Sequence, residues 1–372
     1  MKKHISNTKE RKLVISGHTA KDLHLRIKNI NDLPPIFKIL FKKSTPISKL
    51  RSLINMDFKD VFSIIKENLV APICYSYGGR GPNIAYGAAL LGAKVELISF
   101  VGEDFEKEYP GFYDGNYRGH LEKAGVIMRT LYINPSEIPY LKENHYYGVL
   151  IIRGKETPTI YCVKDVVGND FYLIDDIKGA HVLAEIAPIP KRLIRESDGI
   201  LITSGEPNFN KKIANYAYKL NKEIYFDIGA YRLSHEYLID IIPKCDIIFG
   251  NYFEINMLKN IFNIKNIHNL FLLSDKIKII IEINKIKCLA KIFLRNKDKP
   301  IIVGPLEVKN KVSSVGCCDG FIAGFLAFYS LGYKLLTAVK AGLMECTNIW
   351  RVEGVQEGML SKKELLRLLK NF

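Results

Sequence analysis

Apolar positions along the chain alternate between short continuous runs and helical spacing, most regularly in the second half. The strand-sized runs are Lys12–Ser16, Val95–Val101, Gly199–Ser204, Glu223–Asp227, Asp246–Gly250, Ile277–Ile283, Cys288–Leu294 and Pro300–Val303. The helical spacings are Pro82–Leu91, Lys211–Leu220, Tyr237–Ile242, Phe253–Phe262, Gly320–Tyr329, Lys334–Trp350 and Ser361–Leu369. This alternation predicts an α/β fold with a mostly parallel sheet covered by helices on both faces.

Two other segments have a different pattern. Residues 29–68 contain three prolines and an amphipathic helix predicted around Leu50–Lys66. Residues 129–177 alternate polar with β-branched and aromatic side chains, which predicts strands. These strands are Tyr146–Ile152, Thr157–Val163 and Asp170–Leu173. We expect a small β layer projecting from the main body, within one domain that spans residues 1–372.

The basic composition changes this picture little. The chain has 372 residues and a formal charge of +15, while 48% of its residues are hydrophobic and 25% are charged, as in ordinary globular proteins. Such a charge suits nucleic-acid binding. The lysines are spread along the sequence, however, so we favour ordinary solvated surfaces and rank nucleic acid last among the partners.

The cysteines and the apolar runs bear on location. The seven cysteines form no C-x-x-C pair and no zinc-like spacing with histidine, which indicates reduced thiols and a cytoplasmic protein. The longest mainly apolar run, Phe321–Tyr329, is far shorter than a bilayer requires. We therefore expect no membrane partner.

A glycine-rich turn, Gly78–Asn83, links a predicted strand to a helix. Glycines permit positive φ and close approach to a ligand, and amides at a helix start bind oxygen atoms. Asn83 both donates and accepts hydrogen bonds, which suits a polyol. A tight turn without any ligand explains the same residues.

A second turn, Val315–Gly320, opens another helix. Amides at a helix N-terminus favour anions, and Asp319 in that turn could accept the proton of a hydroxyl that attacks a phosphoryl group. An ordinary first-turn acid is the simpler alternative.

A third cluster, Asn251 and Glu254, follows the strand at Asp246–Gly250. The two side chains start a predicted helix and could face a hydrated Mg²⁺ ion. A capping box, in which Asn251 caps the helix and Glu254 reaches back, explains them equally well.

The order and spacing of these clusters resemble the ribokinase (PfkB) family of carbohydrate kinases. The matching residues are Gly17–Asp22, Gly78–Asn83, Val101–Asp104, Asn251 with Glu254, and Val315–Asp319. With Glu156–Pro158 in the β layer, the chain is most similar to archaeal nucleoside kinases of that family. The resemblance covers nearly the whole chain. It implies a ribokinase-like three-layer sandwich with a small β lid, made from segments within residues 29–68 and 129–177.

The resemblance also implies the chemistry of the site. Asp319 would be the general base, and the amides of Gly316, Cys317 and Cys318 would form an anion hole. The remaining positions are Asp22, Gly78, Gly79 and Asn83 for the acceptor, and Asn251 and Glu254 for Mg²⁺ through water. The implied reaction transfers a phosphoryl group from a nucleotide, with ATP expected, to a hydroxymethyl group of a sugar or nucleoside. A homodimer through the lid is implied as well.

Tyrosines in the expected lid are candidates for stacking a nucleobase, although a half-buried β layer uses tyrosine in any case. They are Tyr132, Tyr140, Tyr146, Tyr147 and Tyr161.

Two departures from the family pattern keep an alternative open. The second signature of the family usually reads Asp-Thr-x-Gly-Ala-Gly-Asp, whereas Ser313 replaces its first residue and Cys318 its last glycine. A Cβ at position 318 is costly if that residue needs positive φ. The nucleotide loop of the family usually contains Thr-Lys-Gly-x-x-Gly, whereas Ile281–Ala290 contains no glycine. The alternative is a non-catalytic sugar- or nucleoside-binding protein on a degenerate kinase scaffold, and the retained Asp319 favours the kinase.

Overall fold

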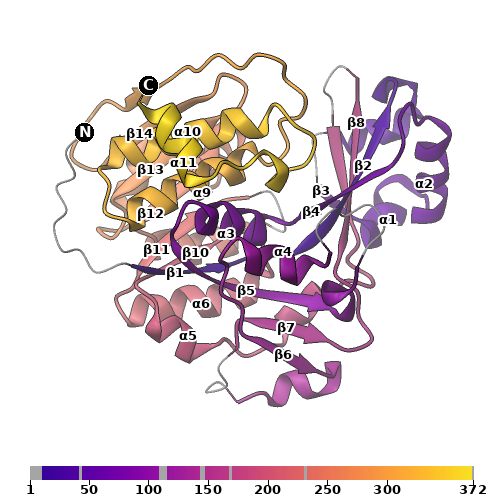
Figure 1. The fold of residues 1–372 in the computed structure, drawn as a ribbon, viewed down its shortest axis with the longest axis horizontal. Coiled ribbons are helices and arrows are strands. Elements are labelled where there is room, and N and C mark those ends of the chain that lie inside the picture. The colour runs from indigo at the N-terminus through magenta and orange to yellow at the C-terminus, as the bar shows by residue number, and fades with distance from the viewer. Residues whose placement is uncertain are drawn as a thin grey trace.

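The structure, a computed structural model, describes residues 11–41, 44–108, 115–142, 147–166, 170–229 and 233–370. Its body is a large sheet between two helical layers, and a smaller sheet projects from one side (Figure 1). In this described part of the chain, no helix combines the length and apolar character needed to cross a membrane.

The large sheet carries ten strands within the described residues. In spatial order they are β15 (Ile301–Val303), β14 (Leu289–Leu294), β13 (Ile279–Asn284), β12 (Ile247–Asn251), β11 (Glu223–Asp227), β10 (Gly199–Ile202), β1 (Lys12–Ser16), β5 (Lys94–Gly102), β7 (Val149–Ile152) and β6 (Thr130–Ile133). All neighbouring strands from β6 to β13 are parallel, whereas β13–β14 and β14–β15 are antiparallel. The predicted fold class is confirmed.

Helices cover both faces of this sheet because its strands are apolar on both sides. One layer contains α3 (Arg80–Leu90), α9 (Cys317–Ser330), α10 (Leu335–Ile349) and α11 (Lys362–Leu369). The other contains α5 (Lys191–Glu196), α6 (Pro207–Lys219), α7 (His235–Ile241) and α8 (Tyr252–Ile261). Helix α9 is buried at every position except Tyr329, since it packs against α3 and α10 as well as the sheet. It therefore holds its first turn rigidly.

The smaller sheet forms the expected β layer, and we call it the lid. Its strands, in spatial order, are β3 (Ser44–Pro46), β9 (Asp170–Ile174), β8 (Thr159–Asp165), β2 (Ala20–Ile27) and β4 (Cys74–Gly78). Helices α1 (Leu50–Ile54) and α2 (Phe58–Glu67) pack on it around their own apolar core. A further short helix, α4 (Tyr117–Lys123), lies near α3 (Figure 1).

The structure corrects two expectations about these segments. The single helix predicted over Leu50–Lys66 is split, because Asn55 adopts a left-handed φ of 54° after α1. The predicted strand Tyr146–Ile152 does not belong to the lid: β7 pairs in parallel with β5 and β6 in the large sheet. Tyr146 itself lies outside the described residues. The lid instead takes β2 and β4, whose turns lead directly to the candidate site.

Candidate active site

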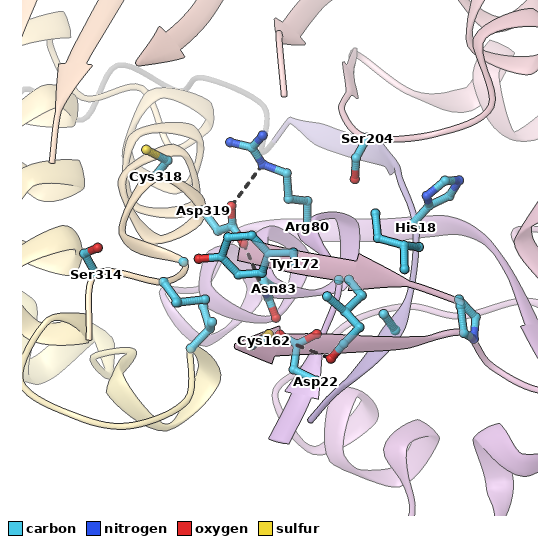
Figure 2. A pocket seen from close by; sticks show the side chains of 18 of the residues that line it. His18, Asp22, Arg80, Asn83, Cys162, Tyr172, Ser204, Ser314, Cys318 and Asp319 are labelled. Carbon is cyan, nitrogen blue, oxygen red and sulfur yellow. Dashed lines mark hydrogen bonds and ion pairs between the residues drawn. The ribbon is translucent and has the colours of Figure 1, made fainter. Parts of the chain in front are cut away.

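A cavity of about 250 Å³ lies between the lid and the end of the large sheet. Strands β1, β10, β11 and β12 all run parallel, so the loops that follow them meet at one edge of the sheet. Most residues predicted for the site line this cavity (Figure 2). They are Asp22, Gly79, Asn83, Asn251, Glu254, Gly316, Cys318 and Asp319. Gly78 and Cys317 do not line it.

A different neighbour explains why each position of the first turn, Gly78 and Gly79, is a glycine. A Cβ at Gly78 would lie 2.1 Å from the carboxylate of Asp22, so the missing side chain makes room for that carboxylate. Gly79 has a φ of 88°, and a Cβ there would lie 2.4 Å from the backbone oxygen of His18. Gly78 therefore contributes space behind the cavity wall rather than a contact with a ligand.

Asp22, on β2 of the lid, is a buried carboxylate that faces the cavity. Its Oδ1 atom has no hydrogen-bond partner among the described residues. Burial raises the pKa of Asp22 well above its usual range, and the nearby charges of Asp319 and Glu357 raise it further. An acceptor hydroxyl would satisfy this oxygen, as a substrate-binding role requires.

Asp319 lies in the first turn of α9, with its carboxylate on the cavity wall (Figure 2). The cap residue Gly316 adopts a left-handed φ of 71° and, as a glycine, provides no side-chain cap for the first amides of the helix. Cys318 is not among the described residues with positive φ, so its Cβ carries no backbone strain. Cys318, where the family usually has glycine, thus fits this turn without a positive φ. Cys317 points away, and its thiol contacts the backbone oxygen of Cys346 at 3.4 Å.

Arg80, the first residue of α3 and part of the first glycine turn, is the electrostatic centre of the site. Its Nε atom lies 3.0 Å from Oδ2 of Asp227 and 3.2 Å from Oδ1 of Asp319, and Nη1 lies 3.7 Å from Oε1 of Glu254. Burial lowers the pKa of the guanidinium, but these three carboxylates outweigh that effect and raise it. One cation, 20% exposed, therefore pairs with an acid at the end of β11 and with acids in the first turns of α8 and α9.

The charge state of Asp319 follows from opposing influences. Burial raises its pKa, while Arg80 and a hydrogen bond from Asn83 lower it, and the net effect is a raised pKa. The Nδ2 atom of Asn83 donates to Oδ2 of Asp319 at 2.9 Å. A carboxylate made more basic by burial, whose ionised form is stabilised by Arg80 and Asn83, suits proton abstraction from a hydroxyl.

Asn251 and Glu254 form the capping box that the sequence left as an alternative. Oδ1 of Asn251 accepts from the amides of Phe253 and Glu254, and Oε2 of Glu254 accepts from the amide of Asn251 at 2.7 Å. The other oxygen of Glu254, Oε1, lies 3.7 Å from Nη1 of Arg80 at the cavity wall. Within the described ranges, no group of three or more His, Cys, Asp or Glu side chains is arranged to hold a metal ion. Two such side chains suit an ion that keeps most of its water ligands.

Sequence reasoning missed several residues of this cavity. The signal for Arg80 was available, because a cation in a glycine turn after a strand stands where α/β sheets bind their ligands. Asp227 ends β11 and does not itself line the cavity, so only its contact with Arg80 links it to the site. None of the described tyrosines proposed for stacking lines the cavity, whereas Tyr172 does. Lys285, in the turn between β13 and β14, also lines it where the glycine loop was expected.

Comparisons with known proteins agree with this architecture. No family model matches the chain. A nucleoside kinase of Methanothermobacter thermautotrophicus is 24% identical over 374 residues, covering 97% of this chain and 96% of that protein. A nucleoside kinase of Methanocaldococcus jannaschii is 27% identical over 287 residues, covering 76% and 82%.

Among solved structures, the crystal structure of a Methanocaldococcus jannaschii nucleoside kinase, described as an archaeal member of the ribokinase family, has a TM-score of 0.68. It is 22% identical and covers 97% of this chain and 99% of that one. These comparisons confirm the resemblance inferred from the motifs. The chain has the ribokinase fold and resembles archaeal nucleoside kinases of the ribokinase family.

Proposed function

We propose that the protein transfers a phosphoryl group from a nucleotide, with ATP as the expected donor, to a hydroxymethyl group of a nucleoside or sugar. The kinase relatives support the enzyme class, a phosphotransferase with an alcohol group as acceptor. Because both relatives are nucleoside kinases, we place nucleosides ahead of sugars as acceptors. The observation that carries the proposal is the buried Asp319 in the first turn of an uncapped helix, beside the cavity.

In the proposed reaction, the acceptor oxygen attacks the γ-phosphorus while the bond to the β-phosphate oxygen breaks. Asp319 takes the proton of the attacking hydroxyl. The amides of Gly316, Cys317 and Cys318 stabilise the charge on the transferring group, since a helix N-terminus favours an anion. Asp22, Gly79 and Asn83 hold the acceptor so that its hydroxyl meets Asp319.

The nucleotide is expected to arrive as its Mg²⁺ complex, and Glu254 with Asn251 would contact the water ligands of that ion. Lys285 adds a positive charge on the same side of the cavity. Closure of the lid over the cavity would exclude water, so that transfer to the acceptor outcompetes hydrolysis.

Two accompanying expectations remain predictions. A homodimer through the lid would cover exposed side chains at and beside its edge strand β4, namely Val70, Ile73 and Tyr75. A cytoplasmic location rests on the cysteines, which are unpaired throughout the described residues.

The second candidate function, a binder without catalysis, is favoured by one observation. The turn that replaces the family's glycine loop is a tight β13–β14 hairpin, in which Asn284 pairs with Leu289. Calorimetry with ATP and Mg²⁺ separates the two functions. The kinase predicts binding of the nucleotide together with transfer to an acceptor, whereas acceptor binding without any nucleotide binding would leave only the binder.

A further inference from the structure

The loop between α10 and α11, residues 351–358, touches both the lid and the turns of the candidate site. We call it the C-terminal loop. Val355 packs against Gly316 so closely that a Cβ on that glycine would lie 2.3 Å from it. Gln356 reaches Asn83, and Glu353 reaches lid strand β8. No motif in the sequence pointed to this loop.

Gln356 belongs to a buried chain of hydrogen bonds whose direction is fixed. The hydroxyl of Tyr117 donates its single proton to the backbone oxygen of Gly78 at 2.6 Å, so it can only accept from Nε2 of Gln356 at 3.1 Å. The same Nε2 atom donates to Oδ1 of Asn83 at 2.9 Å. Oε1 of Gln356 contacts Nε2 of His120, also at 2.9 Å. The amide of Gln356 is thereby held in one orientation.

This orientation decides which end of Asn83 faces Asp319. Because Oδ1 of Asn83 accepts from Gln356, its NH₂ group must face Oδ2 of Asp319, to which it donates. If Asn83 turned over, its oxygen would face the carboxylate, and two acceptors would meet in a buried site. The hydrogen bond from Asn83 also lowers the pKa of Asp319 and so supports the ionised form that a base needs.

Three residues before Gln356, the loop is attached to the lid. The carboxylate of Glu353 pairs with Nζ of Lys164 on β8 and lies 3.9 Å from Nη2 of Arg26 on β2. Lys164 is buried and the side chain of Glu353 is 30% exposed, so the pair is partly shielded from solvent. A movement of the lid would therefore pull on the loop that holds Gln356.

We propose that Gln356 is a positioning residue that fixes the amide of Asn83 toward Asp319, and that Glu353 makes this positioning depend on the lid. The proposal rests on the proposed function of Asp319 as the base, which it deepens.

The first test compares two variants of Gln356 at pH 8.5. Gln356→Leu removes the donor and leaves Asn83 free to turn over. Gln356→Glu keeps the shape but, once ionised, offers only acceptors, so Asn83 should turn its oxygen toward Asp319. We expect kcat to fall about 10-fold in the first and about 100-fold in the second, the range set by one hydrogen bond to a charged group. A Gln356→Glu variant as active as the wild type, or more active than Gln356→Leu, would overturn the proposal.

A matched control separates positioning from folding. The side chain of Asn348 donates to the backbone oxygen of Gly358 at 2.8 Å and holds the same loop, but it is not part of the chain to Asp319. Asn348→Ala should lower the melting temperature while leaving the pH profile of kcat unchanged. If Gln356→Leu does not fold, Tyr117→Phe removes the hydroxyl that accepts from Gln356 and donates to the backbone oxygen of Gly78, and it should lower kcat in the same direction. An unchanged kcat in Tyr117→Phe would count against the proposal.

A readout that needs no phosphoryl transfer keeps the two proposals distinguishable. The carboxyl carbon of Asp319 can be titrated by ¹³C NMR and assigned from the signal lost in Asp319→Asn. Its pKa should rise in Gln356→Leu relative to the wild type. A chain without any kinase activity but with this rise would refute the proposed function alone, whereas an active chain without the rise would refute the positioning role alone.

The link to the lid is tested by a double-mutant cycle. Glu353→Gln keeps the shape and removes the charge that pairs with Lys164. If the lid acts through the loop, the losses of kcat in Glu353→Gln and Gln356→Leu should combine to less than their product. Losses that multiply fully would show that Glu353 does not act through Gln356.

Discussion

Replacing Arg80 by methionine removes the guanidinium that three acids share, while the length of the side chain is largely kept. Asp227 lies 3.0 Å, Asp319 3.2 Å and Glu254 3.7 Å from its nitrogen atoms in the wild type. The side chain of Asp227 is only 1% exposed and that of Asp319 8%, so water would solvate these carboxylates poorly once the cation is lost. The three carboxylates would then repel one another in a site of low dielectric constant.

The size of the effect follows from these contacts. Removing one partner of a buried ion pair costs about 3–5 kcal/mol of stability, and Arg80 contacts two acids at close range. We therefore expect a loss of at least about 3 kcal/mol at pH 8. Without the cation, the pKa values of Asp319 and Glu254 rise further. The folded variant then binds more protons than the unfolded chain. Its loss of unfolding free energy relative to the wild type therefore grows as pH rises and shrinks as the acids become protonated.

Thermal unfolding from pH 5 to pH 9 measures this loss of stability. The pH profile of kcat reports the pKa of Asp319, the proposed base. The acid limb of the profile should move up by about 1 to 3 pH units in Arg80→Met, because an adjacent arginine lowers a carboxyl pKa by that amount. Arg80→Lys keeps the positive charge but lacks the several donors of the planar guanidinium. Its loss of stability and its shift of the acid limb should therefore be intermediate. A melting temperature that differs from the wild type by the same amount at every pH, with an unmoved acid limb, would refute this electrostatic account.

Three further changes test other parts of the structure. Glu345 is fully buried on α10, and burial raises its pKa to about 8. Glu345→Gln should therefore stabilise the fold by about 3 kcal/mol at pH 7. Denaturation curves should show that this gain vanishes below about pH 4.5. Gly78→Ala places a Cβ 2.1 Å from the carboxylate of Asp22 and should weaken acceptor binding at least 10-fold by calorimetry, with nucleotide binding unchanged. Cys318→Ala should keep wild-type kcat, because the proposed anion hole uses the backbone amide of residue 318 and its φ is not positive, and a large loss would give the thiol a role.

The sequence predicted the body of the fold well because buried parallel strands leave a clear pattern. Lys12–Ser16 and Glu223–Asp227 match β1 and β11 at both ends. The lid was harder. Val149–Ile152 has the same β-branched character as the lid strands, and only its parallel pairing with β5 assigns it to the large sheet. The local composition of a strand does not determine which of two sheets it joins.

The candidate site shows a similar division. Asp319 and Asn83 stand in recognisable turns, and the structure brings them within 2.9 Å. Asp227 and Gln356 lie outside any motif, because their contribution depends on contacts with residues far away in the chain. At position 318 the sequence suggested backbone strain if the residue needed positive φ. The structure gives Cys318 no positive φ, so this strain is absent.

The central claim, that Asp319 is the base of a phosphoryl transfer, is tested most directly by one comparison. The wild type and Asp319→Asn are incubated with ATP, Mg²⁺ and a panel of nucleosides and sugars, products are followed by ³¹P NMR, and acceptor binding is measured in parallel by calorimetry. The account predicts a phosphorylated product with the wild type, none with Asp319→Asn, and similar acceptor affinities for both. Equal product formation by the two proteins, or loss of acceptor binding together with loss of transfer, would contradict it.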